Sequence, residues 1–193
     1  MLTVFIDFKS PASYLALEPT IQLADKYACP ITWLPFSTAE RDIPSEGTNP
    51  DLAASHAAVR ANSIKRIHQR YAELRGIEMI YPAEQLPTDL ALGTLGATKG
   101  NPIDFIRGAF KHYWVESGSL DDFETVRTLM EKCLAESPPL EKQLRKNLRE
   151  QQEKAEALGV VDAPTYLIDG QLFLGREHLP WVESILQNKY ETG

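Results

Sequence analysis

The sequence has few thiols: its two cysteines, Cys29 and Cys133, lie far apart. A Cys-x-x-Cys pair, which dithiol redox enzymes and many zinc sites require, is absent. The histidines are not grouped as metal ligands either; they are His56, His68, His112 and His178. We therefore expect free thiols, no metal site and no dithiol oxidoreductase activity.

An excess of basic residues is also missing. The chain has 20 Lys and Arg against 27 Asp and Glu, a net charge of −7, which argues against a nucleic-acid partner. No apolar run approaches the length that spans a membrane. The N-terminal apolar run is interrupted at Asp7 and has no basic leader, unlike a signal peptide. We expect a cytoplasmic protein without nucleic-acid or membrane partners.

The chain does have enough apolar residues for a core. Hydrophobic residues make up 43% of its 193 positions, which suits one domain, or one domain with a large insertion. Residues 2–6 are apolar and rich in β-branched side chains, so they predict a strand. Ser10 can cap the following helix, with Pro11 at its first position. The Ser10 hydroxyl is thus expected at a helix N-terminus, which favours negative charge.

The middle of the chain is predicted to be helical. Residues 31–34 form a second predicted strand, parallel to the first because a helix connects the two. Residues 35–50 lose all periodicity and predict a long loop. From 51 to 158, apolar residues recur at helical spacing. Caps within this region are expected at Thr88, at Asn101 with Pro102 as the first helical residue, and at Ser137.

The end of the chain returns to β structure. Residues 165–168 and 171–174 predict two strands joined by Asp169-Gly170, a dipeptide that favours a tight hairpin turn. A closing helix is expected from Leu179. The predicted order is βαβ, a helical block, then ββα.

That order and two local motifs resemble a known family. A βαβ half and a ββα half on one sheet is the thioredoxin arrangement, and residues 162–165, Asp-Ala-Pro-Thr, resemble its cis-proline segment. Residues 7–15, Asp-Phe-Lys-Ser-Pro-Ala-Ser-Tyr-Leu, stand where redox members carry Cys-x-x-Cys. With residues 159–165 and 175–179, they resemble the DsbA-like superfamily, in its branch of 2-hydroxychromene-2-carboxylate isomerases and kappa-class glutathione transferases.

The resemblance implies an architecture. The fold would be α/β and thioredoxin-like, interrupted by a large all-helical insertion. The thioredoxin-like domain would comprise residues 1–37 and 159–193, and the insertion residues 38–158. The resemblance also implies a small-molecule substrate and is compatible with a homodimer.

The resemblance further implies a glutathione-dependent isomerase or transferase with Ser10 as the catalytic residue. In the family this serine holds the glutathione sulfur. A hydroxyl donor at a helix N-terminus stabilises a thiolate, the reactive form of the thiol. The thiolate would add to a conjugated, aromatic-derived electrophile as a covalent catalyst. The residues implied to bind glutathione are Ser10, Pro11, Ala12, Asn49, Ala163, Pro164, Arg176 and Glu177.

Structural alternatives stand beside these roles. Ser10 can be a helix cap and nothing more, and Pro164 a structural cis-proline. Arg176 and Glu177 can be solvated loop residues.

A second hypothesis comes from departures from the family pattern. Asp162 stands where the family often has glycine, and Ser63 and Ile67 replace a common tyrosine and aspartate. These differences motivate a non-catalytic or divergent DsbA-like binding protein that has lost the redox pair. Phe110 and Trp114 are expected either in the core of the helical block or beside a substrate.

Overall fold

The computed structural model describes residues 1–38, 52–134 and 139–190. Two compact units make up the chain: Met1–Thr38 with Ile80–Gly193, and Ala39–Met79. The elements of the first unit, in chain order, are β1 (Leu2–Ile6), α1 (Pro11–Lys26), β2 (Ile31–Pro35), α3 (Asp89–Ala97), α4 (Ile103–Trp114), α5 (Phe123–Leu134), α6 (Glu141–Ala157), β3 (Thr165–Ile168), β4 (Gln171–Leu174), the 3-10 helix η1 (Arg176–His178) and α7 (Leu179–Tyr190).

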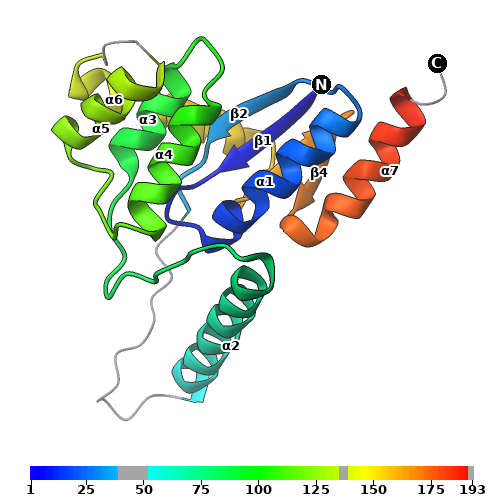
Figure 1. The fold of residues 1–193 in the computed structure, drawn as a ribbon, viewed down its shortest axis with the longest axis horizontal. Helices are drawn as coiled ribbons and strands as arrows, with labels where there is room; N and C mark the ends of the chain where they lie inside the picture. The colour runs from blue at the N-terminus through cyan, green and yellow to red at the C-terminus, as the bar shows by residue number, and fades with distance from the viewer. Residues whose placement is uncertain (39–51, 135–138, 191–193) are drawn as a thin grey trace. The chain divides into compact units, whose positions relative to one another are not determined.

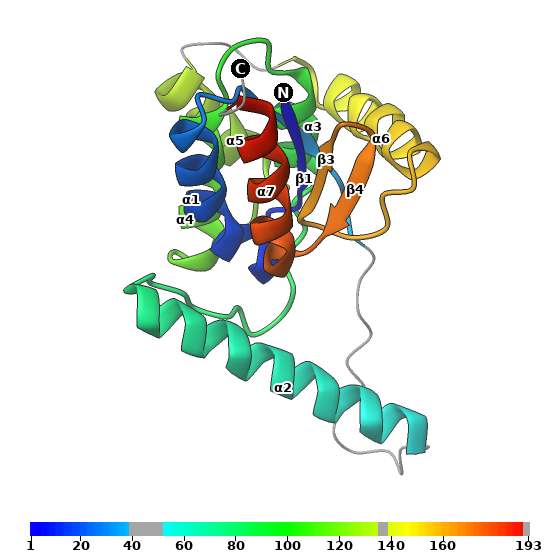
Figure 2. The same ribbon diagram turned by 90° about the vertical axis from the view of Figure 1, so that its right-hand side faces the viewer.

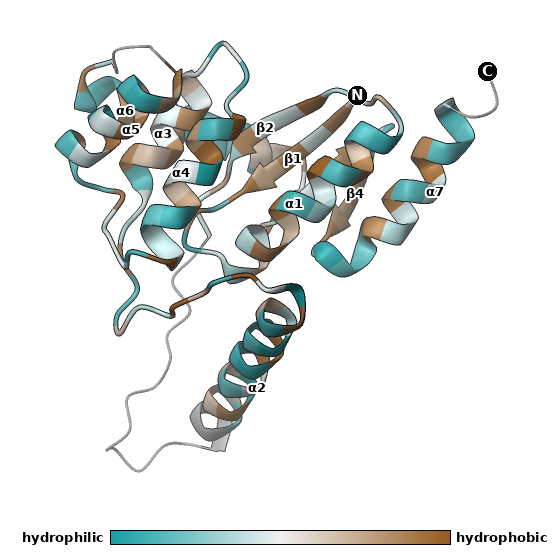
Figure 3. Ribbon diagram, viewed as in Figure 1, coloured by the Kyte–Doolittle hydropathy of each residue, from teal (hydrophilic) through white to brown (hydrophobic). Residues whose placement is uncertain are grey.

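The strands form one mixed four-stranded sheet in the order β2-β1-β3-β4 (Figure 1). β1 pairs in parallel with β2 and antiparallel with β3, and β3 pairs antiparallel with β4. The central strand β1 consists mostly of apolar residues, as Figure 3 shows. Helices α1 and α7 lie on one side of the sheet and α3 and α6 on the other (Figure 2). Both faces of the sheet are therefore covered, which explains why four of the five residues of β1 are apolar.

The predicted fold is confirmed. All four strands lie where their β-branched and apolar runs predicted them, and the helices between β2 and β3 form the predicted helical insertion. At the hairpin, Asp169 and Gly170 adopt φ values of 47° and 76°, the left-handed conformation that an Asp-Gly turn favours. The chain therefore has an α/β, thioredoxin-like fold.

Two predicted helix starts need correction. Thr88 precedes α3, but its hydroxyl makes no capping bond and donates instead to Asp7 Oδ1 at 3.2 Å. The first turn of α3 is served by Asp121, whose Oδ1 accepts from the Leu90 N–H at 3.1 Å. A more distant residue thus took over the capping role. Asn101 Oδ1 does accept from the Ile103 N–H, yet the helix begins at Ile103, one residue later than predicted. The predicted start at Ser137 lies outside the described residues.

The second unit contains α2 (Leu52–Arg75). The residue that follows this helix, Gly76, has a φ of 64°. By compactness, helices α3 to α6 belong with the sheet rather than with α2. The partition into a thioredoxin-like domain and an insertion at residues 38 and 158 is a division by fold, and it stays a prediction. Among the described residues, no helix is both long enough and apolar enough to cross a membrane.

Tyr113 gives the folded unit a predicted sensitivity to alkaline pH. Its side chain is buried in α4 and its hydroxyl bonds the Leu86 backbone. Burial raises the pKa of Tyr113 from 10 to about 12, and burial also raises the pKa of Tyr81. The unfolded chain loses the Tyr113 proton first, so the free energy of unfolding should fall by about 2–3 kcal/mol as pH rises between these two values.

Urea denaturation at successive pH values measures this fall. Tyr113→Phe has no proton to lose, so its stability should decline less than that of the wild type over the same pH range. Equal declines in the two proteins would show that Tyr113 ionises alike in the folded and unfolded states.

Candidate functional site

The turn between β1 and α1 is ordered by Ser10. Its Oγ accepts from the Ser13 N–H at 3.2 Å, so Ser10 is the N-cap of α1, and Pro11 is the first helical residue. The predicted cap is therefore confirmed. Ser10 is 8% exposed, and Pro11 and Ala12 are half-buried. The hydroxyl thus lies at the N-terminus of a 16-residue helix, close to the protein surface.

The loop before β3 brings a distant segment to this turn. The Ala163–Pro164 peptide is cis, as the sequence predicted, and Ser10 Oγ donates to the Ala163 carbonyl at 2.8 Å. These two residues are 153 positions apart in the chain. The structure therefore joins the Ser-Pro turn and the cis-proline segment in a single contact.

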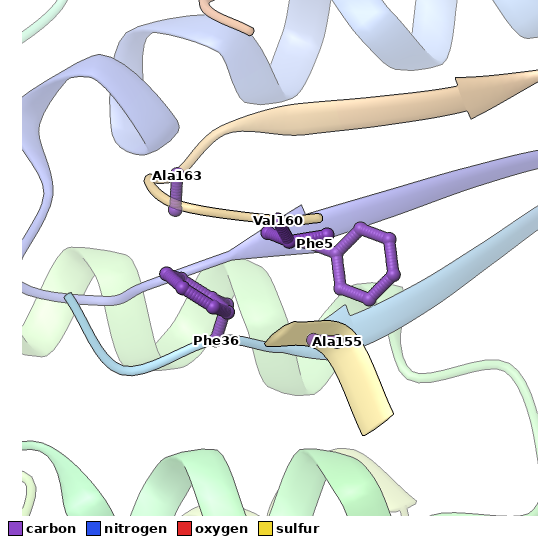
Figure 4. Close-up of a cluster of buried hydrophobic side chains, with 5 residues drawn as sticks. All are labelled: Phe5, Phe36, Ala155, Val160 and Ala163. Atoms are coloured by element: carbon purple, nitrogen blue, oxygen red, sulfur yellow. The ribbon is translucent and has the colours of Figure 1, made fainter. Parts of the chain in front are cut away.

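An apolar cluster holds the cis-proline loop on the sheet. Its members are Phe5 of β1, Phe36 beyond β2, Ala155 of α6, and Val160 and Ala163 of the loop, all of them buried. Figure 4 shows that these side chains come from four segments and gather beneath the loop. Burial of this cluster fixes the backbone of residue 163 relative to β1, and hence relative to Ser10.

The backbone groups of Ala163 are both occupied. The carbonyl accepts from Ser10, and the N–H donates to the carboxylate of the preceding residue, Asp162 Oδ1, at 2.8 Å. Thr165 Oγ1 also donates to the Asp162 carbonyl, at 2.6 Å. A ligand that pairs with the peptide groups of residue 163 must therefore replace partners supplied by the chain itself.

The turn after β4 lies beside the same loop. The Gly175 N–H donates to the Pro164 carbonyl at 2.8 Å, and η1 contacts α1. Arg176 is half-buried, whereas Glu177 is exposed and its carboxylate folds back against Gly175. Arg176 and Glu177 thus follow directly on a residue that is bonded to the cis-proline. Asn49 lies outside the described residues.

Asp7 is a buried residue of this site to which the sequence analysis gave no role. It is 0% exposed and follows β1 directly. Oδ1 accepts from the Lys9 N–H at 3.1 Å and the Thr88 hydroxyl at 3.2 Å. Oδ2 accepts from the N–H and the hydroxyl of Thr38, at 2.7 and 2.8 Å. The signal in the sequence was a carboxylate at the end of an apolar strand, where an unpartnered charge would be costly.

The electrostatics of Asp7 combine opposing effects. Burial raises the pKa of Asp7 above its ordinary 3.8, while the Lys9 ammonium, 4.0 Å away, and the Thr38 donors lower it. Every hydrogen bond found at this carboxyl within the described residues is donated to it. The carboxyl therefore ties the Ser10 turn to the segment after β2 and to the start of α3.

Trp114 and Phe110 belong to the core. Phe110 is 0% and Trp114 2% exposed, which selects the core interpretation of both residues. Trp114 Nε1 donates to the Phe8 carbonyl at 2.9 Å, and its ring stacks on Tyr14 with the planes 4° apart. Helix α4 thus supports the turn on which Ser10 lies, from the side of the helical insertion.

Comparison with known proteins identifies the family of this chain. Residues 1–187 match the model of the DSBA-like thioredoxin domain. The chain belongs to this family. In this DSBA-like thioredoxin domain, Ser10 and Ser13 occupy the turn after β1, and the turn contains no cysteine.

Among characterised proteins, two relatives are 2-hydroxychromene-2-carboxylate isomerases. The protein from Pseudomonas putida is 25% identical over 189 residues, which cover 94% of this chain and 92% of the relative. The one from Sphingobium xenophagum is 24% identical over 188 residues, which cover 94% and 95%. This DSBA-like domain is therefore a distant homologue of 2-hydroxychromene-2-carboxylate isomerase.

A solved structure has a similar fold over the whole chain. The structure of selenomethionine 2-hydroxychromene-2-carboxylate isomerase superimposes with a TM-score of 0.73 at 21% identity, covering 100% of this chain and 98% of that one. At this identity the likeness concerns the fold. The long helical insertion is thus shared with that structure.

Proposed function

We propose that this protein is a glutathione-dependent isomerase or transferase in which Ser10 stabilises the cofactor thiolate. One observation carries the proposal: the Ser10 hydroxyl, at the N-terminus of α1, lies 2.8 Å from the carbonyl of the residue before the cis-proline. The distant homology to 2-hydroxychromene-2-carboxylate isomerase supports a conjugated electrophile as the substrate.

The donors at Ser10 suit an anionic sulfur. The hydroxyl accepts from the Ser13 N–H, and its own proton now points to the Ala163 carbonyl. A serine hydroxyl rotates freely about its C–O bond, so the same proton can turn to a thiolate placed beside it. The partial positive charge of the α1 N-terminus acts on the same position. Both effects favour the thiolate over the thiol.

The remaining contacts would orient a tripeptide. The N–H and carbonyl of Ala163, once released from Asp162 and Ser10, could pair with the cysteinyl unit as one strand pairs with another. Arg176 can bind a carboxylate through two parallel hydrogen bonds, and Glu177 can pair with an ammonium group. These are the charged groups of the γ-glutamyl end of glutathione. Asn49 remains a predicted contact outside the described residues.

When bound, glutathione would supply a nucleophile that adds reversibly to a conjugated double bond and leaves after rotation about the resulting single bond. The chain itself would keep the sulfur ionised through Ser10 and hold its backbone at Ala163. The stack of Trp114 on Tyr14 would support the turn on which Ser10 lies. In the transferase version of this chemistry, the same residues would act, the sulfur would stay bonded to carbon, and the carbanion left by the addition would take up a proton from water.

Ser10→Ala tests the proposal directly. In the wild type, reduced glutathione should bind saturably in calorimetry, and its thiol pKa, followed by thiolate absorbance against pH, should lie below that of free glutathione. Removing a hydrogen bond to a charged group should raise this pKa by about one to two units. Loss of the cap should also cost about 1 kcal/mol of stability.

The matched control is Ser184→Ala, which removes an exposed serine hydroxyl that bonds its own helix at the Pro180 carbonyl. It should leave glutathione binding and the thiol pKa unchanged. If neither the wild type nor the control binds glutathione at millimolar concentration, the cofactor proposal fails. The alternative, a divergent DsbA-like binding protein without this catalysis, then takes its place.

A further inference from the structure

We propose that Asp162 competes with glutathione for the Ala163 N–H and so sets the affinity of the site. This inference rests on the proposed function. Its basis is the hydrogen bond from the Ala163 N–H to Asp162 Oδ1, at 2.8 Å, within the loop that contacts Ser10. The carboxylate occupies the position that a backbone carbonyl of a paired ligand would take.

The competition follows from the geometry of one donor. An N–H group makes one strong hydrogen bond, and a carboxylate is a stronger acceptor than a peptide carbonyl. Pairing of an extended ligand with residue 163 therefore requires the Asp162 side chain to rotate away. Asp162 is half-buried, so part of the residue already contacts solvent.

The hydrogen bonds from Ser10 and to Asp162 differ in the free energy needed to break them. The Ser10 proton leaves the carbonyl by rotation of a hydroxyl and gains an anionic acceptor in return. Asp162 must give up a charge-assisted bond and brings a negative charge to the approach of a negatively charged ligand. A glycine at this position would leave the N–H without this acceptor. Asp162 thus weakens binding of the cofactor and speeds its release.

Three variants separate the hydrogen bond from the charge. Asp162→Ala removes both, Asp162→Asn keeps an oxygen acceptor without the charge, and Glu153→Ala removes an exposed negative charge on α6 as the control. Calorimetry with reduced glutathione should give roughly tenfold tighter binding to Asp162→Ala, a smaller gain for Asp162→Asn and no change for Glu153→Ala. S-methylglutathione, which has no ionisable thiol, should show the same order if the competition is for the N–H.

A second measurement needs no ligand. Hydrogen exchange of the Ala163 amide, followed by NMR, should be roughly tenfold faster in Asp162→Ala than in the wild type, because the N–H has lost its acceptor. Binding that is equal in the wild type and Asp162→Ala, or an unchanged exchange rate, would overturn the inference while leaving Ser10 chemistry intact. If no protein binds either glutathione, the proposed function itself fails, and the exchange rate alone still reports whether Asp162 holds the N–H.

Discussion

Asp7→Asn is expected to lower the free energy of unfolding by about 3–5 kcal/mol. The carboxyl is 0% exposed, and each of its oxygens accepts two hydrogen bonds. An asparagine offers one acceptor oxygen and one NH₂ group. Whichever way its amide is turned, the NH₂ faces the donors of Lys9 and Thr88 or those of Thr38. The threonine hydroxyl on that side can rotate to accept from the NH₂, but the backbone N–H of Lys9 or of Thr38 meets a donor and loses its acceptor.

Urea denaturation of three variants checks this prediction. Asp104→Asn, the same exchange at an exposed aspartate of α4, should change stability by about 0.5 kcal/mol or less. Thr88→Val removes one of the four donors and leaves both oxygens with a partner, so about 1 kcal/mol is expected. Equal stability of Asp7→Asn and Asp104→Asn would show that the hydrogen bonds to the Asp7 carboxyl contribute little to folding.

Gly93→Ala is expected to cost about 3 kcal/mol, because α3 and α6 touch backbone to backbone at this position. A Cβ on Gly93 would lie 2.4 Å from the Leu144 carbonyl oxygen and 2.8 Å from its carbon. Asn147 Nδ2 also donates to the Gly93 carbonyl at 3.1 Å, which ties the helices together at this point. The clash is with backbone, so a rotamer change cannot relieve it, and the helices must move apart.

Two other glycines provide the scale for this measurement. At Gly96 a Cβ would meet side-chain atoms of Asn147, Pro35 and Gln151 at 3.1–3.3 Å, which permits partial adjustment. At Gly100 a Cβ would meet nothing within 4 Å. The melting temperature of Gly93→Ala should therefore lie well below that of Gly96→Ala. The melting temperature of Gly96→Ala should lie at or below that of Gly100→Ala. A wild-type melting temperature for Gly93→Ala would contradict the close packing of α3 on α6.

The homology to 2-hydroxychromene-2-carboxylate isomerase and the packing around Ser10 concern different parts of the proposal. Homology supports the reaction class, while the contact between Ser10 and Ala163 supports the position of the sulfur. Asp7 and Trp114 both hold the turn between β1 and α1, on which Ser10 lies. Asp7 accepts from the Lys9 N–H, and Trp114 donates to the Phe8 carbonyl. Their substitution should therefore change the thiol pKa through the position of Ser10, not through a contact with the ligand.

The sequence alone was sufficient for features that depend on a few neighbouring residues. The four strands, the cap at Ser10 and the turn at Asp169-Gly170 follow from local chemistry. Each could be predicted because its own side chains favour or permit the backbone conformation it requires. The family motifs at both ends of the chain predicted the thioredoxin-like fold. They also indicated that the Ser10-Pro11 turn stands where redox members carry Cys-x-x-Cys.

The tertiary structure decided which partner each polar group takes. Thr88 stands at a helix start, yet its hydroxyl goes to Asp7 because the buried carboxylate is the stronger acceptor within reach, and Asp121 serves the helix instead. Ser10 and Ala163 meet because an apolar cluster from four segments presses the loop on β1. Such choices depend on distances between elements far apart in the chain, and packing sets those distances only when the whole core has formed.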